Sequence, residues 1–265
     1  MSVQWSLARV PVLTELTHRS RLASAAAMGV LQVVLGYFLW HALYAGTTVA
    51  AGMNVDQAVT YATMAVLVTR IRWASRIFSR DALWSLVNDG RIAYWFLRPV
   101  SARRYHLLKS TGEALYWGGW SLAGYLVALA TGLIQPPPDP AVALASVVSL
   151  LLGQVVEYHL LLAVDLLCFW MTTNNNARRV YHFIADFLSG AFVPLWYLPD
   201  AVVTFAGLLP FQSTLNVPLS LYTGRIPPAD APGQLMLQAG WCVLLAGLTR
   251  VMWARVERRV ETQGG

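Results

Sequence analysis

Charge is scarce in this sequence. Charged residues make up 12% of the 265 positions, whereas hydrophobic residues make up 57%. One soluble core of this chain length cannot bury so much apolar surface, so the composition excludes an ordinary soluble domain. A helix needs about 20 apolar residues to cross a bilayer. The chain therefore has room for about six crossings and for no large soluble domain.

Cysteine and lysine are also rare. The two cysteines, Cys168 and Cys242, each lie inside an apolar run, which argues against a disulfide framework. The only lysine, Lys109, follows Leu108, whereas the phosphate-binding loop of ATPases needs a lysine directly after a glycine. The five histidines are scattered, without the paired spacing of a zinc hydrolase. We therefore expect no catalytic residue, no metal site and no cofactor in this chain.

Six apolar runs predict six membrane-spanning helices, and the fold class that we expect is an all-α integral membrane protein. The runs cover residues 22–44, 55–68, 115–134, 141–170, 183–197 and 235–253. A further run, 201–209, lies between Pro199 and Pro210 and is too short to cross. The first run follows a polar segment and is too long for the core of a cleavable signal peptide, so we expect it to be retained as a span.

The basic residues indicate how these spans are oriented. Cytoplasmic loops keep arginine and lysine, whereas short translocated loops lose them. Basic residues gather in residues 1–21, 70–110 and 171–180 and in the C-terminal tail, while 45–54 and 135–140 have none and 198–232 has only Arg225. Six crossings with both termini in the cytoplasm satisfy this pattern. A seventh crossing through 201–209 would place the tail outside, so residues 199–216 are predicted to form an external re-entrant or interfacial hairpin.

These boundaries predict one transmembrane domain over residues 1–265. Residues 1–21 form a cytoplasmic or interfacial segment, residues 70–110 a cytoplasmic region, and residues 199–232 the external hairpin and loop. Within the cytoplasmic region, Ser79 is placed to cap a short helix and Gly90 to end it. This helix is amphipathic and is followed by an aromatic cluster. Two interpretations are open: a helix lying on the inner leaflet, or a coupling element that receives force from a cytoplasmic motor.

The fifth apolar run is interrupted by residues that break helices. Gly190 and Pro194 lie within it, and Pro199 and Pro210 come after it. Proline removes a backbone donor and clashes with the preceding helical turn. A broken helix in a bilayer is costly unless it lines a cavity or packs on protein. The pattern favours a segment that lines a cavity or packs on protein, and the alternative is an external loop that is simply apolar.

Acidic and basic residues also occur inside the predicted spans. Glu157 lies near the middle of the fourth run and Asp165 nearer its cytoplasmic end, while Arg70 and Arg72 lie at the inner end of the second run, within reach of Asp165. A charge near the bilayer centre costs at least about 2.5 kcal/mol. We expect structural ion pairs. Two alternatives use the same groups: a proton-coupled secondary transporter, or a membrane-embedded lipid-modifying enzyme that employs Glu157, His159 and Asp165.

Two strings resemble a known family. Residues 88–100, NDGRIAYWFLRPV, are similar to the segment after the second span of the six-span permease subunits of type-2 ABC transporters. Residues 188–199, LSGAFVPLWYLP, with the later strings at 209–211 and 222–224, resemble that family's fifth span and external hairpin. The resemblance covers nearly the whole chain in the number and order of spans.

The resemblance implies an ABC exporter permease in the inner membrane of a prokaryote. Two permeases, identical or paralogous, would sit among membrane lipids on two cytoplasmic ATP-binding subunits, which hold the ATP and magnesium; nucleic acid plays no part. The implied contact with the ATPase comprises Asp81, Leu83, Trp84, Leu86, Val87, Asp89, Gly90 and Arg91. The implied external gate comprises Gly190, Pro194, Pro199 and Pro210.

Overall fold

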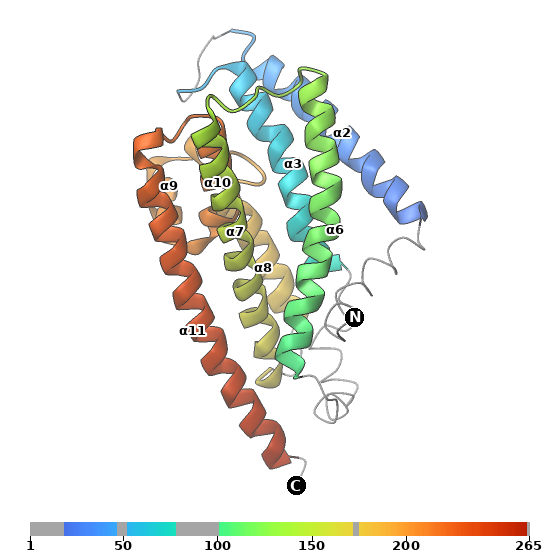
Figure 1. The fold of residues 1–265 in the computed structure, drawn as a ribbon, viewed down its shortest axis with the longest axis vertical. Coiled ribbons are helices and arrows are strands. Elements are labelled where there is room, and N and C mark those ends of the chain that lie inside the picture. Colours follow the sequence, from blue (N-terminus) through green and yellow to red (C-terminus); the bar gives the residue numbers. More distant parts are fainter. Residues whose placement is uncertain (1–18, 47–51, 78–100, 172–174, 264–265) are drawn as a thin grey trace.

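The computed structural model describes residues 19–46, 52–77, 101–171 and 175–263. Within these ranges the regular elements are eight α-helices and four short 3₁₀-helices, which confirms the all-α class. The long helices run side by side along the long axis of the molecule, and α2 diverges from the others toward its N-terminal end (Figure 1). The predicted coupling helix falls in residues 78–100 and lies outside the described residues.

Five helices are long and three are short. The long ones are α2 (Arg19–Leu43), α3 (Val55–Ile77), α6 (Ala102–Ala130), α7 (Pro140–Leu166) and α11 (Ala231–Gln263). The short ones are α8 (Asn175–Leu188), α9 (Asp200–Gly207) and α10 (Asn216–Tyr222). The 3₁₀-helices are η1 (Leu167–Phe169), η2 (Leu195–Tyr197), η3 (Pro210–Thr214) and η4 (Pro228–Asp230).

Three of the described segments are long and apolar enough to cross a bilayer. They are Leu22–Leu43, Pro140–Leu166 and Pro228–Arg258. Helices α3 and α6 are of comparable length, with 23 and 29 residues, but both contain several charged residues. The chain is therefore a membrane protein with helical spans, and the described helices account for half of the six expected crossings on length and composition alone.

Polar side chains fix where the helices begin. Asn54 and Gln57 form a reciprocal capping box at the start of α3, in which each backbone N–H donates to the other side chain, at 3.0 and 2.8 Å. Asp139 accepts from the Val142 N–H at the start of α7, directly before Pro140. Ser101 caps α6 in the same way. These contacts satisfy backbone donors that no helical carbonyl can reach.

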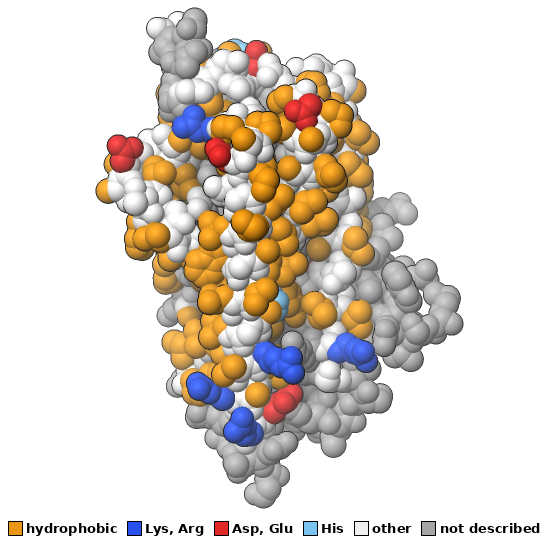
Figure 2. Space-filling view, turned by 60° about the vertical axis from the view of Figure 1, so that its left-hand side comes forward, with side chains coloured by type: hydrophobic (Ala, Val, Ile, Leu, Met, Phe, Trp, Pro, Cys, Tyr) orange, Lys and Arg blue, Asp and Glu red, His pale blue; other side chains and the backbone are white. Residues whose placement is uncertain are grey.

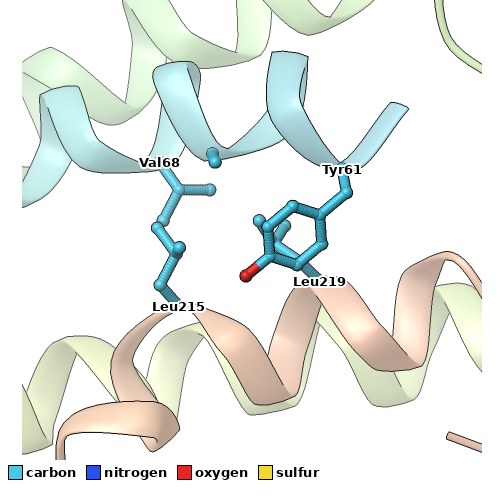
Figure 3. Packing of buried hydrophobic residues seen from close by; sticks show 5 residues of the cluster. Tyr61, Val68, Leu215 and Leu219 are labelled. Atoms are coloured by element: carbon cyan, nitrogen blue, oxygen red, sulfur yellow. The ribbon is translucent and has the colours of Figure 1, made fainter. Parts of the chain in front are cut away.

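The helices form two groups that α10 connects. Helix α7 contacts α11, α8, η3 and α10, whereas α3 contacts α2, α6 and α10. The core between α3 and α10 contains Tyr61, Val68, Leu215 and Leu219 (Figure 3). On the outside, hydrophobic side chains cover the middle of the molecule, and basic side chains gather at the end where α11 finishes (Figure 2). This is the distribution expected of a protein surrounded by lipid.

The expected fifth span does not form one continuous helix. Helix α8 ends at Leu188, and Gly190 follows with a positive φ of 80°, so only the first six residues of the run 183–197 are helical as expected. At about 1.5 Å per residue, the 14 residues of α8 reach about 21 Å, which is less than the thickness of a hydrocarbon core, about 30 Å. The break follows from the sequence: Gly190 ends α8, Pro194 precedes η2, Pro199 precedes α9, and Pro210 begins η3.

Candidate functional site

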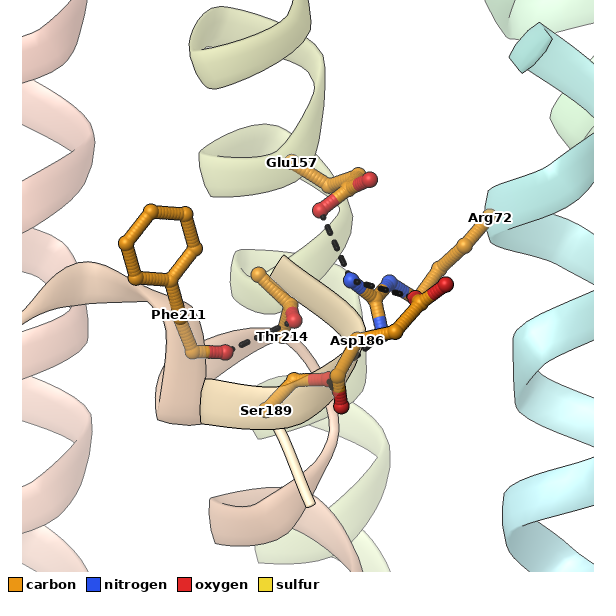
Figure 4. A network of polar contacts seen from close by, with 6 residues as sticks. All are labelled: Arg72, Glu157, Asp186, Ser189, Phe211 and Thr214. Atoms are coloured by element: carbon orange, nitrogen blue, oxygen red, sulfur yellow. Dashed lines mark hydrogen bonds and ion pairs between the residues drawn. The ribbon is translucent and has the colours of Figure 1, made fainter. Parts of the chain in front are cut away.

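A buried arginine connects three helices in the interior. Arg72 of α3 donates from Nη1 to Ser189 Oγ at 2.8 Å and from Nη2 to Glu157 Oε2 at 3.2 Å (Figure 4). The same Nη2 lies 3.7 Å from Asp186 Oδ1. Glu157 belongs to α7, and Asp186 and Ser189 lie at the end of α8. One guanidinium therefore holds α3, α7 and α8 together.

Burial makes this network costly to disturb. The side chain of Arg72 is 0% exposed, and those of Glu157 and Asp186 are 4% and 10% exposed. An isolated charge at such a site costs several kcal/mol, and the opposite charge together with hydrogen bonds must offset that cost. Arginine suits this position because its planar fork donates in several fixed directions at once. The geometry supports a structural ion pair at Glu157.

An ion pair of Asp165 was predicted, but the predicted partner is wrong. Asp165 pairs with Arg178 of α8, Nη1 to Oδ1 at 3.3 Å, rather than with Arg70 or Arg72. Arg70 instead donates to Gln32 Oε1 of α2 at 2.8 Å. The reason is that Asp165 lies in the last turn of α7 and Arg178 in the first turn of α8, and these two helices are in contact.

The groups required by the two alternative mechanisms point to different neighbours. His159 Nδ1 lies 2.9 Å from Thr249 Oγ1 of α11, whereas Glu157 faces α3 and Asp165 faces α8. Among the described residues no three His, Cys, Asp or Glu side chains are grouped as a metal site. In the described part of the chain, Glu157, His159 and Asp165 therefore do not converge on one site.

The end of α8 forms a sharp corner, by which we mean Ser189 and Gly190. The Ala191 N–H donates to Asp186 O at 3.1 Å and satisfies a carbonyl in the last turn. The Tyr61 hydroxyl of α3 lies 3.2 Å from Gly190 O and 3.2 Å from Asn216 Oδ1. A Cβ at position 190 would lie 2.7 Å from that hydroxyl, so both φ and space require glycine there.

The chain after the corner packs closely on α7. At Gly153 a Cβ would lie 2.5 Å from the carbonyl oxygen of Ser213 in η3, which shows how near the two backbones come. Gln238 of α11 donates from Nε2 to Ser213 O at 2.8 Å and to Ser149 O at 3.3 Å. Most of 210–223 is buried. This stretch, η3 followed by α10, is thus covered by protein.

Aromatic residues hold η2, which lies between the corner and α9. The hydroxyls of Tyr197 and Tyr44 are hydrogen-bonded, and the Trp40 ring lies 5.1 Å from that of Tyr197. The guanidinium of Arg225 lies 4.8 Å from the centre of the Trp196 ring, a cation–π distance. Trp196 and Tyr197 thus make specific contacts with distant elements.

The broken segment is the stretch from Gly190 to Asn216, in which short helices alternate with turns. A cavity of about 510 Å³ lies between α2, α3 and the start of this segment. Its wall is mostly apolar, with Trp40, Tyr61 and Tyr197 among the lining residues. Charged side chains in the wall are Arg70 and Asp186. Its volume falls in the range of small-molecule pockets.

The comparison with protein families identifies the chain. Residues 30–264 match the family model described as ABC-2 family transporter protein. The chain belongs to this family. No curated protein and no solved structure matches it significantly. The match covers almost all of the described helices, and it confirms the resemblance inferred from the sequence strings.

Membership in the ABC-2 family indicates which kind of subunit the chain is. ABC-2 membrane proteins pair with ATPase subunits and typically carry no catalytic site or cofactor of their own. This chain is thus the membrane component of an ABC-2 transporter. The expected gate residues lie in the broken segment, where they end or begin its helices, whereas the expected ATPase-contacting residues, 81–91, lie outside the described residues.

Sequence reasoning missed several polar residues of this interior. Tyr61, Ser189, Asn216 and Gln238 are all buried and each makes a side-chain hydrogen bond to another helix or segment. The available signal was a polar side chain inside an apolar stretch, which must find a partner when lipid offers none.

Proposed function

We propose that the chain is the permease subunit of an ATP-driven ABC exporter. Two permeases, identical or paralogous, pair in the inner membrane of a prokaryote and sit on two ATP-binding subunits in the cytoplasm. The family match over residues 30–264 is the observation that carries this proposal. The direction of transport and the substrate-moving cycle are the parts of the proposal that go beyond the family.

The proposed topology has six crossings with both termini in the cytoplasm. The crossings are α2, α3, α6, α7, the segment from α8 to α10, and α11. In the fifth, α8 covers the inner part and the broken chain packed on α7 covers the outer part as a re-entrant hairpin. The basic residues at the end of α11 support a cytoplasmic C-terminus, because arginine is retained on that side.

The proposed cycle moves substrate between two conformations of the permease pair. ATP binding in the partner subunits shifts their balance, and a ligand shifts such a balance only by its differential affinity for the two states. The movement enters through the ATPase contact at residues 81–91 and reaches the external gate at Gly190, Pro194, Pro199 and Pro210. The cavity between α2, α3 and the gate segment supports this route, because it extends along α2 from Gln32 to Leu43.

The contact with the ATPase is testable in the assembled complex. The chain is co-expressed with its ATPase and purified by a tag on the permease, and ATP hydrolysis is measured for Asp89→Ala and Arg91→Ala. We expect the ATPase rate per complex to change in both, since each replaces a charge at the proposed contact. Leu35→Ala, on the exposed face of α2, serves as the control that leaves the rate unchanged.

Wild-type ATPase rates in both variants would contradict the coupling assignment. Purification without any ATPase subunit, followed by transport by the chain alone, would contradict the exporter proposal as a whole. Detection of either terminus from outside intact cells would contradict the six-crossing topology.

A further inference from the structure

We propose that Arg72 and Tyr61 are positioning residues through which α3 sets the place of the corner and of the chain that follows it. This inference rests on the proposed function, because α3 ends at Ile77, directly before the segment expected to contact the ATPase. It goes beyond that function by naming the side chains that carry the movement across the membrane.

The two side chains converge on neighbouring residues from distant points of one helix. Arg72 and Tyr61 are eleven residues apart on α3, about 16 Å along its axis. Arg72 nevertheless bonds Ser189, and the Tyr61 hydroxyl lies 3.2 Å from the carbonyl oxygen of Gly190. The corner is therefore held by one helix from both directions along its axis. A slide of α3 by a few ångströms must lengthen at least one of these contacts.

The contacts to the corner are themselves braced by α7 and α8. Glu157 and Asp186 hold the Arg72 guanidinium at its other terminal nitrogen, Nη2, at 3.2 and 3.7 Å. Ser189 Oγ, which accepts from Arg72, donates to Asp186 O at 3.3 Å. The guanidinium is thus fixed relative to three helices. Its movement with α3 has to alter either the corner or the α7 contact.

Tyr61 contacts both ends of the broken segment. The same hydroxyl lies 3.2 Å from Gly190 O, where the segment leaves α8, and 3.2 Å from Asn216 Oδ1, where α10 begins. Tyr61 is 1% exposed, so water does not substitute for these partners. Displacement of this one hydroxyl changes the anchorage of the whole segment between Gly190 and Asn216.

The test follows the broken segment during the ATP cycle. The permease–ATPase complex is reconstituted in lipid nanodiscs, with Cys168→Ser and Cys242→Ala removing the native thiols and Phe205→Cys on α9 as the reporter. Phe205 is 57% exposed, so a thiol there is accessible to a maleimide. The labelling rate is measured without nucleotide and with ATP plus vanadate, for the reporter alone and combined with Tyr61→Phe or Arg72→Lys.

We expect nucleotide to change the labelling rate in the reporter protein. Tyr61→Phe removes only the hydroxyl, and Arg72→Lys keeps the charge but loses the fork, so each should reduce that change about fivefold, the effect of one hydrogen bond. Tyr125→Phe is the matched control, because it removes a hydroxyl that bonds Tyr222 at 3.0 Å, away from the corner. It should respond as the reporter protein does.

The outcomes separate the two proposals. No nucleotide response in the reporter protein overturns the proposed cycle, and this inference with it. A normal response in the reporter protein and in Tyr61→Phe overturns this inference alone. If Arg72→Lys does not assemble, Tyr61→Phe decides, because its change is small and leaves the aromatic ring in place. A reduced response in the control as well as in the variants also overturns the inference, because the effect would then be general.

Discussion

The most apolar stretches of α2 and α7 have the same mean hydropathy, 1.8, but differ in how much of them is buried. In the most apolar stretch of α2, 0% of the residues are buried, whereas in that of α7 33% are buried. The buried residues of α7 include Ser146, Ser149, Gly153 and Glu157, which follow helical spacing along one face. Hydropathy thus predicts that both helices cross, while small and polar residues at helical spacing indicate which one packs inside the protein.

The largest effect that this comparison predicts is at Glu157. Glu157→Gln leaves Arg72 and Asp186 buried without the charge that holds the guanidinium from α7. Removing one partner of a buried pair costs about 3–5 kcal/mol when the other charge is left unpaired, and Asp186, 3.7 Å from the guanidinium, keeps the cost at the lower end of that range. The free energy of unfolding in mixed micelles should fall by this amount, and folded yield should fall with it. Glu257→Gln, at an exposed position of α11, is the control. An equal loss of unfolding free energy in the two variants would show that the buried ion pair of Glu157 adds no stability.

A smaller effect is expected from a single methyl group on each of the two helices. Gly153→Ala in α7 should cost about 1–3 kcal/mol, because the new Cβ meets the Ser213 carbonyl oxygen at 2.5 Å. Gly36→Ala in α2 is the matched change: its Cβ lies 4.0 Å from that of Ala62, an ordinary contact. It should be neutral or stabilise by up to about 1 kcal/mol. Equal changes in the free energy of unfolding for the two variants would contradict this difference between α2 and α7.

The smallest effect is expected at the C-terminal end of α7. Asp165→Asn removes the charge that pairs with Arg178 at 3.3 Å. The two side chains are only 12% and 11% exposed, but Arg178 lies in the first turn of α8 and can extend its guanidinium toward water once the carboxylate is gone, so the loss should be about 1 kcal/mol. Folded yield measured by size-exclusion chromatography should drop slightly. If yield holds while the ATPase activity of the complex collapses, Asp165 has a functional role instead.

The sequence predicted the type and the breaks of the helices better than their partners. Gly190 and Pro210 act through their own backbone, so their effect is visible locally, and the structure interrupts its helices at both. Arg72 and Glu157 are 85 positions apart, and their pairing depends on how α3 and α7 pack. A depth argument alone placed Arg72 beside Asp165, because it ignores which face of each helix points inward.

Tyr61 illustrates a second limit. Tyrosine is common at the edges of membrane helices, so a tyrosine in an apolar run is easily interpreted as an interfacial anchor. Its partners, Gly190 and Asn216, lie 129 and 155 positions away. Only the folded arrangement shows that this hydroxyl serves two remote segments. Its position several residues inside the run, rather than at the edge, was the available indication.

The anchorage of both ends of the broken segment has a consequence for how such a protein can vary. Since Gly190 and Asn216 meet the same phenol, the residues between them form a loop that starts and finishes at one place. Substitutions or insertions near the middle of that loop can alter its outer surface while α8 and α10 keep their positions. Related chains can therefore diversify what they present at this surface without rebuilding the helices beneath it.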